Sequence, residues 1–379
     1  MQNWKDIFEE DPPNASMTSY TGDGVLKVQI ITIDNPEYDA GTSSVIYTAK
    51  LLHGAIEDLQ SLYSPTLFID KDAAGGTHAI QVKNNCTQTI WLGASGNCKS
   101  QASPCPEFFE PPKGANVEMG KQTHIVFHVD KGWGGRFWPR TDCKFNKDGL
   151  CPDGGVDCCD AGGCTNKKNE FAKECFNSGQ PPVLVIEPTF DAPSGNGPID
   201  YFDTSMVDGY NVLASIEAVA KTYNTNPDPG MDSKFWCTTA GCASSPACPD
   251  FLKDDKGNCW SPCQYANRQN LSDEEKKKLC CKCTMDTPCT CPDQCCDGAY
   301  GCSPYQLVDG KQKYPPNMCC DPWGTHNNNR PWDQKYIDYI DDVKKACPEV
   351  YAWQFDDFKS TINCRKTNGL VDYKLTVCP

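Results

Sequence analysis

Cysteine is the residue type that most constrains the chemistry of this chain. All 27 cysteines lie between Cys86 and Cys378, so the first 85 residues contain none. Such a content is typical of proteins that are oxidised outside the cytosol, where no glutathione pool reduces disulfides. We therefore expect disulfides and an extracellular or lumenal location. Because 27 is odd, we also expect one thiol that is free, bonded to another chain, or paired beyond this sequence.

Metal binding is the other chemistry that cysteine could supply, and the sequence disfavours it. The chain has only five histidines, and adjacent cysteines such as Cys280 and Cys281 lack the two-residue spacing of zinc knuckles. His124 and His128 fall on one face of an expected strand, which is the ordinary pattern of a half-buried strand with a polar face. Phosphate-binding loops, nucleophile elbows and metalloprotease motifs do not occur in the sequence. We predict no metal ligands and no cofactor.

The charge of the chain restricts its partners. The net charge of −15 argues against nucleic acid and anionic membranes, since both require a basic surface. No segment has the length and hydrophobicity of a membrane span, and residues 1–12 are too polar for the apolar part of a signal peptide. Because disulfides imply export, we expect an upstream targeting segment or another export route. Three glycosylation sequons agree with export, at Asn14, Asn85 and Asn270.

A chain of 379 residues has room for two or three domains, and the cysteine-free segment is the first candidate. Residues 1–23 are polar and are predicted to be a mobile lead. Hydrophobic periodicity predicts a strand at 25–33, a helix within 45–63 and a strand at 65–69. We expect residues 1–76 to form an α/β extension that is partly disordered and ends in a glycine-rich linker.

From Thr77 onward the pattern is mainly β. Alternating or β-branched runs predict strands at 78–84, 87–92, 124–129 and 183–186, and short strands between Gly and Pro turns are typical of an antiparallel β-sandwich. Helical spacing after Pro331 predicts one helix at 333–346. The expected organisation is a β-sandwich core at about 77–140, 181–236 and 348–379, a small loop domain at 141–180, and a disulfide-rich domain at 237–347 with an insertion at about 282–319.

Six separated motifs occur in order along this part of the chain. They are Asn84-Asn-Cys-Thr-Gln-Thr-Ile-Trp, Gly134-Gly-Arg-Phe-Trp-Pro-Arg-Thr-Asp-Cys, Gln180-Pro-Pro, Asp203-Thr-Ser-Met-Val-Asp-Gly-Tyr-Asn, Cys347-Pro-Glu-Val-Tyr-Ala-Trp-Gln-Phe-Asp-Asp and Tyr373-Lys-Leu-Thr-Val-Cys-Pro. Together they resemble the thaumatin-like proteins, the pathogenesis-related family five that includes osmotin. The resemblance covers roughly 77–379. It implies a sandwich with a cleft against the disulfide-rich domain, secretion, an antifungal defence role, and binding or slow hydrolysis of β-1,3-glucan.

The resemblance also implies a cleft lined by one arginine and four acidic residues. In this sequence the matching residues are Arg136, Glu187, Asp203, Asp208 and Asp357. If the register of the last motif slips by one, Asp356 takes the place of Asp357.

Paired carboxyl groups are what glycoside hydrolysis needs, one protonated as general acid and one ionised. We expect Glu187 to be the acid and Asp203 its partner, with Asp208 in reserve. Tyr201 is preferred to Phe202 as a sugar contact, because strand alternation places it on the same side as Asp203. Two alternatives stay open: a carbohydrate-binding protein without catalysis, or a structural matrix protein. On spacing alone, the acids could equally be strand-end residues that pair with Arg136.

Disulfide pairing follows from the resemblance as well. It implies the bonds Cys86–Cys378, Cys143–Cys151, Cys237–Cys364, Cys242–Cys347, Cys248–Cys259 and Cys263–Cys280. Closeness in sequence adds Cys98–Cys105. Segment 1–76 has no counterpart in the family pattern, and we expect it to contribute nothing to the cleft.

Overall fold

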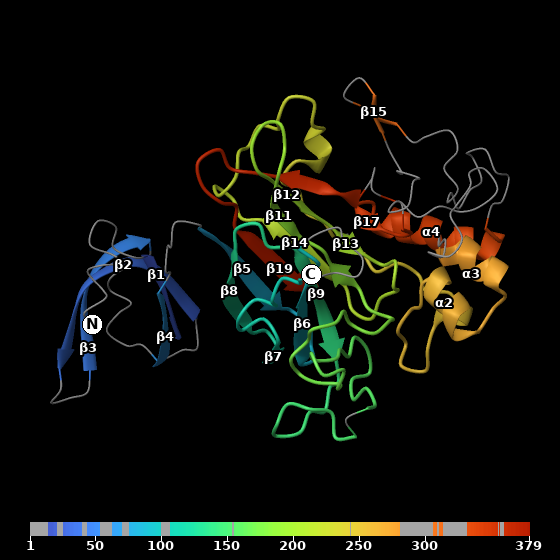
Figure 1. Ribbon diagram of the computed structural model, residues 1–379, viewed down its shortest axis with the longest axis horizontal. Coiled ribbons are helices and arrows are strands. Elements are labelled where there is room, and N and C mark those ends of the chain that lie inside the picture. Colours follow the sequence, from blue (N-terminus) through green and yellow to red (C-terminus); the bar gives the residue numbers. More distant parts are fainter. Residues whose placement is uncertain are drawn as a thin grey trace. The chain divides into compact units, whose positions relative to one another are not determined.

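The computed structural model describes residues 14–20, 26–39, 44–53, 63–69, 76–99, 107–153, 155–242, 244–280, 306–308, 311–313, 332–354, 356 and 360–379. The chain divides into two compact units, Met1–Gly76 and Thr77–Pro379. Figure 1 shows their strands and helices in the colours of the sequence.

The first unit contains one four-stranded antiparallel sheet in the order β3-β2-β1-β4. Its strands are β1 (Asn14–Tyr20), β2 (Leu26–Asp39), β3 (Ser44–His53) and β4 (Tyr63–Ile69). The strands predicted at 25–33 and 65–69 are confirmed.

Two predictions for this unit are wrong. The expected helix within 45–63 is a strand as far as His53, because the run of Val45, Ile46, Tyr47 and Thr48 favours extended backbone and pairs along the long strand β2. The rest of that helix lies outside the described residues. The expected mobile lead contains β1, which pairs with both β2 and β4.

The second unit is built on two larger sheets and one smaller one. A six-stranded sheet has the order β17-β13-β10-β9-β6-β7, with β6 (Ile90–Gly96), β7 (Val117–Met119), β9 (Gly135–Thr141), β10 (Val185–Ile186), β13 (Thr204–Ser205) and β17 (Val350–Tyr351). A four-stranded sheet has the order β14-β19-β5-β8, with β5 (Thr77–Asn84), β8 (His124–Asp130), β14 (Ala214–Ala218) and β19 (Tyr373–Val377). A three-stranded sheet, β11-β12-β18, joins Thr189–Ala192, Ile199–Phe202 and Ile362–Cys364.

The alternation of side-chain direction along each strand explains how the two larger sheets share one core. Ile80 and Val82 on β5, Leu92 on β6 and Phe137 on β9 are fully buried in the same cluster, while Gln81, between the two residues of β5, is exposed. The predicted mainly β fold is therefore confirmed. Each strand predicted from Thr77 onward has a counterpart, although β6 is shifted to Ile90–Gly96 and β10 is limited to Val185–Ile186.

Helices lie at the side of this unit away from β5 and β8 (Figure 1). They are α2 (Pro262–Arg268), α3 (Asp273–Cys280) and α4 (Gln334–Ala346), with single 3-10 turns at Ser233–Phe235 and Asp250–Leu252. The predicted helix at 333–346 is confirmed as α4. Apart from the hairpin of β15 (Gln306–Val308) and β16 (Lys311–Lys313), the expected insertion at 282–319 lies outside the described residues.

Disulfides join distant parts of the second unit. Five of the bonds that the resemblance implies are present: Cys86–Cys378, Cys237–Cys364, Cys242–Cys347, Cys248–Cys259 and Cys263–Cys280. Cys98 is disulfide-bonded, and its expected partner Cys105 lies outside the described residues.

The expected bond Cys143–Cys151 is wrong. Cys143 is bonded to Cys159 and Cys151 to Cys158, and Cys164 and Cys175 form a third bond in the same loop segment. An antiparallel bridge between Thr141 and Ala161 sets residue 143 opposite residue 159, which decides the pairing.

Trp138 anchors this loop segment to the six-stranded sheet. Its side chain is fully buried, and its Nε1 donates a hydrogen bond of 2.7 Å to the carbonyl oxygen of Gly162. Gly93 and Gly179 leave the space that the indole ring fills: a Cβ atom at either position would lie 2.4 Å or 2.5 Å from the ring.

We expect Gly93→Ala to lower the free energy of unfolding by about 1–3 kcal/mol, because the added methyl group overpacks the site of Trp138. Urea denaturation of the oxidised protein measures the change. Gly195→Ala is the matched control, because no atom lies within 4 Å of a Cβ added there. Equal stability of the two variants would contradict this account of the packing.

Candidate functional site

Strand register brings three of the predicted cleft residues into one row. In the antiparallel ladders, Ile186 of β10 is opposite Phe137 of β9 on one side and Thr204 of β13 on the other. The next position along each strand therefore aligns Arg136, Glu187 and Asp203. Residues directly opposite each other project from the same face of a sheet. Since Phe137 and Ile186 face the core, the row lies on the outer face.

Direct contacts support this alignment. Arg136 Nε lies 2.7 Å from Glu187 Oε1, and their side chains are 38% and 28% exposed. Arg136 Nη1 donates to Ser178 Oγ at 3.0 Å, and the backbone N–H of Glu187 donates to the carbonyl oxygen of Asp203 at 3.1 Å. The row is therefore held in place and still open to a ligand.

Asp208 lies in the turn after β13. Its Oδ1 accepts a hydrogen bond of 2.6 Å from Gln264 Nε2, and Gln264 belongs to helix α2. The disulfide Cys263–Cys280 fixes this helix, so the disulfide-rich domain positions the Asp208 carboxylate. Asp357 lies outside the described residues.

Asp356, the alternative to Asp357, is part of the protein interior. Its side chain is 1% exposed, and its Oδ2 lies 2.7 Å from Lys344 Nζ on α4. Ala352 N–H and Ser360 Oγ complete the contacts of this pair. Burial raises the pKa of Asp356 to about 6, and the charge of Lys344 opposes that rise. Asp356 therefore stabilises the fold and is not an accessible cleft carboxylate.

Tyr201 is the accessible aromatic residue beside the row. Phe202 is fully buried, as strand alternation predicts, whereas Tyr201 is partly exposed and burial raises the pKa of its phenol. Tyr201 pairs with Thr189 across β11 and β12 and precedes Asp203 by two residues, and its position on the same side as Asp203 stays a prediction from strand alternation. The other aromatics near the cleft acids, Trp138, Tyr210 and Trp353, are buried.

The predicted glycosylation sites differ in their surroundings. Asn270 is exposed just after α2 and accepts a hydrogen bond from Lys276. Asn85 is partly buried beside the bond Cys86–Cys378, and Asn14 is the first residue of β1. Glycosylation of these residues stays a prediction.

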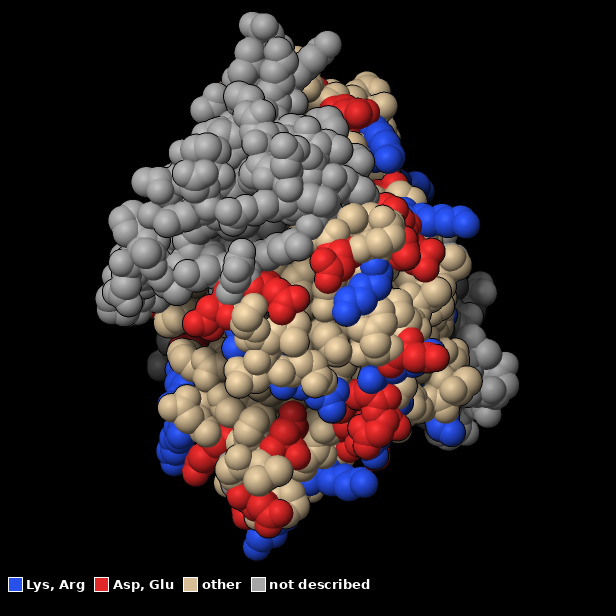
Figure 2. Space-filling model, turned by 90° about the vertical axis from the view of Figure 1, so that its right-hand side faces the viewer, with Lys and Arg blue, Asp and Glu red and all other residues tan. Residues whose placement is uncertain are grey.

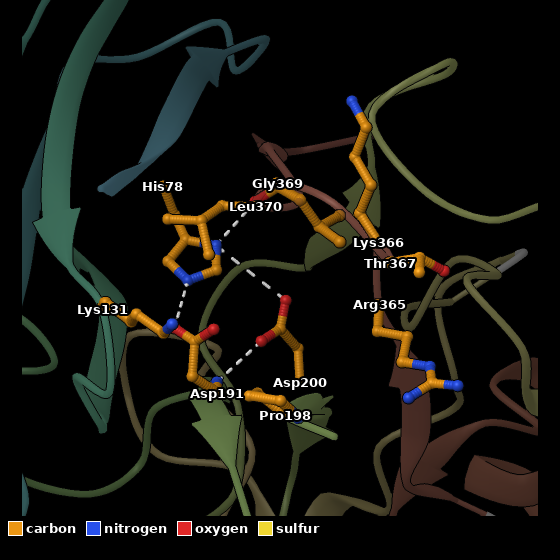
Figure 3. A pocket seen from close by; sticks show the side chains of 11 residues that line it. His78, Lys131, Asp191, Pro198, Asp200, Arg365, Lys366, Thr367, Gly369 and Leu370 are labelled. Atoms are coloured by element: carbon orange, nitrogen blue, oxygen red, sulfur yellow. Dashed lines mark hydrogen bonds and ion pairs between the residues drawn. The ribbon is translucent and has the colours of Figure 1, made fainter. Parts of the chain in front are cut away.

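Sequence reasoning missed a second cluster of chemically active side chains. Among the described residues, His78, Asp191 and Asp200 are the group that could hold a metal ion, with one ligand atom of each within 4.8 Å of the others. They come from β5, β11 and β12 and lie at the end of a cavity of about 150 Å³ (Figure 3). No local spacing signals this cluster, because its members are up to 122 residues apart in sequence.

Hydrogen bonds fix both the ring and the carboxylates of this cluster. His78 Nε2 lies 2.9 Å from Asp191 Oδ2, and His78 Nδ1 lies 2.7 Å from the carbonyl oxygen of Val371. Burial alone would lower the pKa of His78, but the hydrogen bond to Asp191 and the charge of Asp200 outweigh it and raise the pKa. Burial raises the pKa of Asp200, against the charge of His78.

The distribution of charge on the surface agrees with the argument from net charge against nucleic acid and anionic membranes as partners. On the face in Figure 2, acidic and basic side chains of the described residues are interspersed, without a continuous basic patch. No helix among the described residues is long and apolar enough to cross a membrane.

We expect Lys344→Met to lower the free energy of unfolding by roughly 3–5 kcal/mol, because it leaves the Asp356 carboxylate buried without its cation. Lys374→Met is the control. Lys374 pairs with Glu217 at 2.8 Å, but both side chains are 41% exposed, so its loss should cost about 1 kcal/mol or less. Chemical denaturation measures both, and equal losses would contradict the interior role of Asp356.

Comparison with known proteins places the chain in a family. A model of the Thaumatin family matches residues 84–301. Pathogenesis-related protein 5 of Arabidopsis thaliana is 29% identical over 83% of this chain and 95% of that protein, and the glucan endo-1,3-beta-glucosidase of Prunus avium is 26% identical over 80% and 93%. Among solved structures, the thaumatin-like xylanase inhibitor TLXI matches at 15% identity, covering 38% of this chain and 78% of that one, with a TM-score of 0.27. Because the family match spans more than half of the sequence, the chain belongs to the thaumatin family.

Proposed function

We propose that the Thr77–Pro379 unit binds β-1,3-glucan at the row of Arg136, Glu187 and Asp203. The observation that carries this proposal is the row itself, in which a guanidinium and two carboxylates lie side by side and partly exposed on one sheet face. A guanidinium donates hydrogen bonds to sugar hydroxyls and carboxylates accept them. The Prunus avium relative is named for action on 1,3-β-glucan, which supports this choice of sugar.

Tyr201 and Asp208 extend the proposed site. Tyr201 is the aromatic surface on which a sugar ring stacks, since it is partly exposed and two residues from Asp203. Asp208, held by Gln264, contributes a further acceptor on the side of the disulfide-rich domain.

Hydrolysis is the second part of the proposal, and the geometry sets its conditions. Glu187 as general acid must carry a proton, whereas its partner in the 2.7 Å contact is the Arg136 cation. Catalysis therefore requires the substrate to open this contact, and binding without turnover is the outcome if it stays closed. Directly opposite residues have Cβ atoms about 4.5–5.5 Å apart. This is a separation of Cβ atoms, and the separation of the two carboxyl groups, which the side-chain rotamers set, decides between the retaining and the inverting outcome.

Secretion and a defence role complete the proposal. The disulfides of the second unit require an oxidising compartment. A secreted protein that binds a wall polysaccharide is placed where it meets fungal cell walls, and the relative named as a pathogenesis-related protein supports this role.

We expect Glu187→Gln to weaken co-sedimentation with insoluble β-1,3-glucan about tenfold or more, because it removes a charged acceptor and leaves Arg136 without its partner. Glu217→Gln is the control, since Glu217 also forms an exposed ion pair but lies on β14. Equal binding by wild type and Glu187→Gln would remove Glu187 from the site.

Release of reducing sugar from soluble glucan by wild type but not by Glu187→Gln would show catalysis. Binding without product over long incubation would show a lectin.

Deletion of residues 1–76 tests whether the first unit takes part. All described residues of the proposed site belong to the Thr77–Pro379 unit, so the truncated protein should bind glucan within about twofold of the full chain. Near-ultraviolet circular dichroism confirms that the truncated protein is folded. A large loss of binding by a folded truncated protein would show that residues 1–76 contribute to the site.

A further inference from the structure

The cluster of His78, Asp191 and Asp200 has the form of a ligand site and lies apart from the proposed glucan row. His78 is fully buried, Asp200 is 3% exposed, and the Asp191 side chain is 8% exposed at the cavity. Residues of β12 and of the segment that follows β18 line the cavity (Figure 3). A small ion can therefore reach groups that are otherwise closed to water.

The His78 ring is oriented as a metal ligand would be. A carbonyl oxygen can only accept a hydrogen bond, so the 2.7 Å contact with Val371 places a proton on Nδ1. Histidine ligands commonly donate their other ring N–H in this way, which fixes the tautomer and directs the free nitrogen at the metal. Nε2 is the other ring nitrogen here, and without an ion it donates a hydrogen bond of 2.9 Å to Asp191 Oδ2, in the position that an ion would take. Two ligands at about 2.1 Å from one ion and at right angles are separated by about 3 Å.

The two carboxylates are held in place by the surrounding backbone and side chains. Asp191 Oδ2 accepts a hydrogen bond from Gly132 N–H, and Asp200 accepts from Asp191 N–H and from the Tyr373 hydroxyl. Asp191 has a φ of 50°, in a region that residues other than Gly, Asn and Asp rarely adopt. The register of β11 against β12 shifts by one residue between Thr189 and Ala192. This β-bulge turns the Asp191 side chain toward His78.

Charge balance favours a divalent cation over a proton alone. With His78 neutral and both carboxylates ionised, the cluster carries a charge of −2, and little of it is exposed to solvent. A proton on Nε2 leaves −1, whereas a divalent ion leaves zero. Of the basic residues that line the cavity, Arg365 is paired with Asp228 at 2.7 Å, and Lys131 and Lys366 lie at the rim.

We propose that His78, Asp191 and Asp200 form a binding site for one divalent transition-metal ion. His78 Nε2 and the Asp191 carboxylate are the direct ligands, and Asp200, whose Oδ2 lies 3.9 Å from His78 Nδ1, adds the second negative charge beside them. An imidazole with two carboxylates suits zinc, manganese or iron in their divalent states. Binding exchanges the Nε2 proton for the ion and links β5 to the β11–β12 hairpin.

Isothermal titration with zinc chloride at pH 8 tests the proposal on the full, oxidised chain. The protein is first stripped with a chelator and treated with iodoacetamide, so that an unpaired cysteine cannot bind zinc. Wild type should bind one zinc ion. His78→Gln should abolish that binding, and Asp191→Asn should weaken it at least tenfold, the usual cost of altering a metal site.

Matched controls are His124→Gln on β8 and Asp130→Asn, which remove an imidazole and an exposed carboxylate elsewhere in the same sheet. Both should bind as wild type does. If wild type shows no saturable one-to-one binding, or if the His78 and Asp191 variants bind like the controls, the proposal is overturned and the cluster is a buried ion pair.

A measurement on wild type keeps the test valid if the variants fail to fold. Proton–nitrogen spectra of protein labelled at histidine should show Nε2 of His78 losing its proton and shifting at one equivalent of zinc, while Nδ1 stays protonated. An unchanged His78 ring at saturating zinc would overturn the proposal. Glucan binding plays no part in any of these readouts.

Discussion

The pairing of the two ends of the Thr77–Pro379 unit is the constraint on which the rest of its structure depends. β5 opens the unit and β19 closes it, and the two run parallel as the inner strands of the four-stranded sheet. The bond Cys86–Cys378 joins their far ends across 292 residues. On a chain-entropy estimate, closing a loop of this length constrains the unfolded chain by roughly 5–6 kcal/mol, an upper bound because nested disulfides shorten the effective loop.

Both sites follow from this closure. Tyr373 is aligned with Ile80, so the same register sets Val371 beside His78, whose ring it orients. Buried side chains of β5 and β19 form one half of the core, and Phe137 and Ile186 of the six-stranded sheet form part of the other half. Because those residues face inward, their neighbours Arg136 and Glu187 must face outward. The exposed row and the buried cluster are therefore consequences of one packing arrangement.

The sequence predicts what depends on local pattern or on family motifs, and little else. The strands after Thr77 and helix α4 follow from periodicity, and Glu187 and Asp203 follow from motifs that register then brings together. Local pattern failed for β3, where extended pairing with β2 overrides a helical spacing. The family resemblance failed at Cys143, because this loop contains the adjacent cysteines Cys158 and Cys159, and only the folded loop decides which of its cysteines pair. The His78 cluster requires three segments whose contact depends on tertiary structure.

The β-bulge in β11 shows why the His78 cluster cannot be predicted from the alternation of side chains along a strand. Regular alternation from Glu187 through Thr189 would place Asp191 on the outer face with the proposed glucan row. The extra residue in β11 and the positive φ of Asp191 reverse its side chain, which then meets His78 in the interior. On β12, Asp200 lies beside His78, and the next residue, Tyr201, is partly exposed. The β11–β12 hairpin thus contributes to a buried ionic cluster on one side and to a partly exposed surface on the other. The left-handed backbone conformation of Asp191 determines to which side its carboxylate belongs.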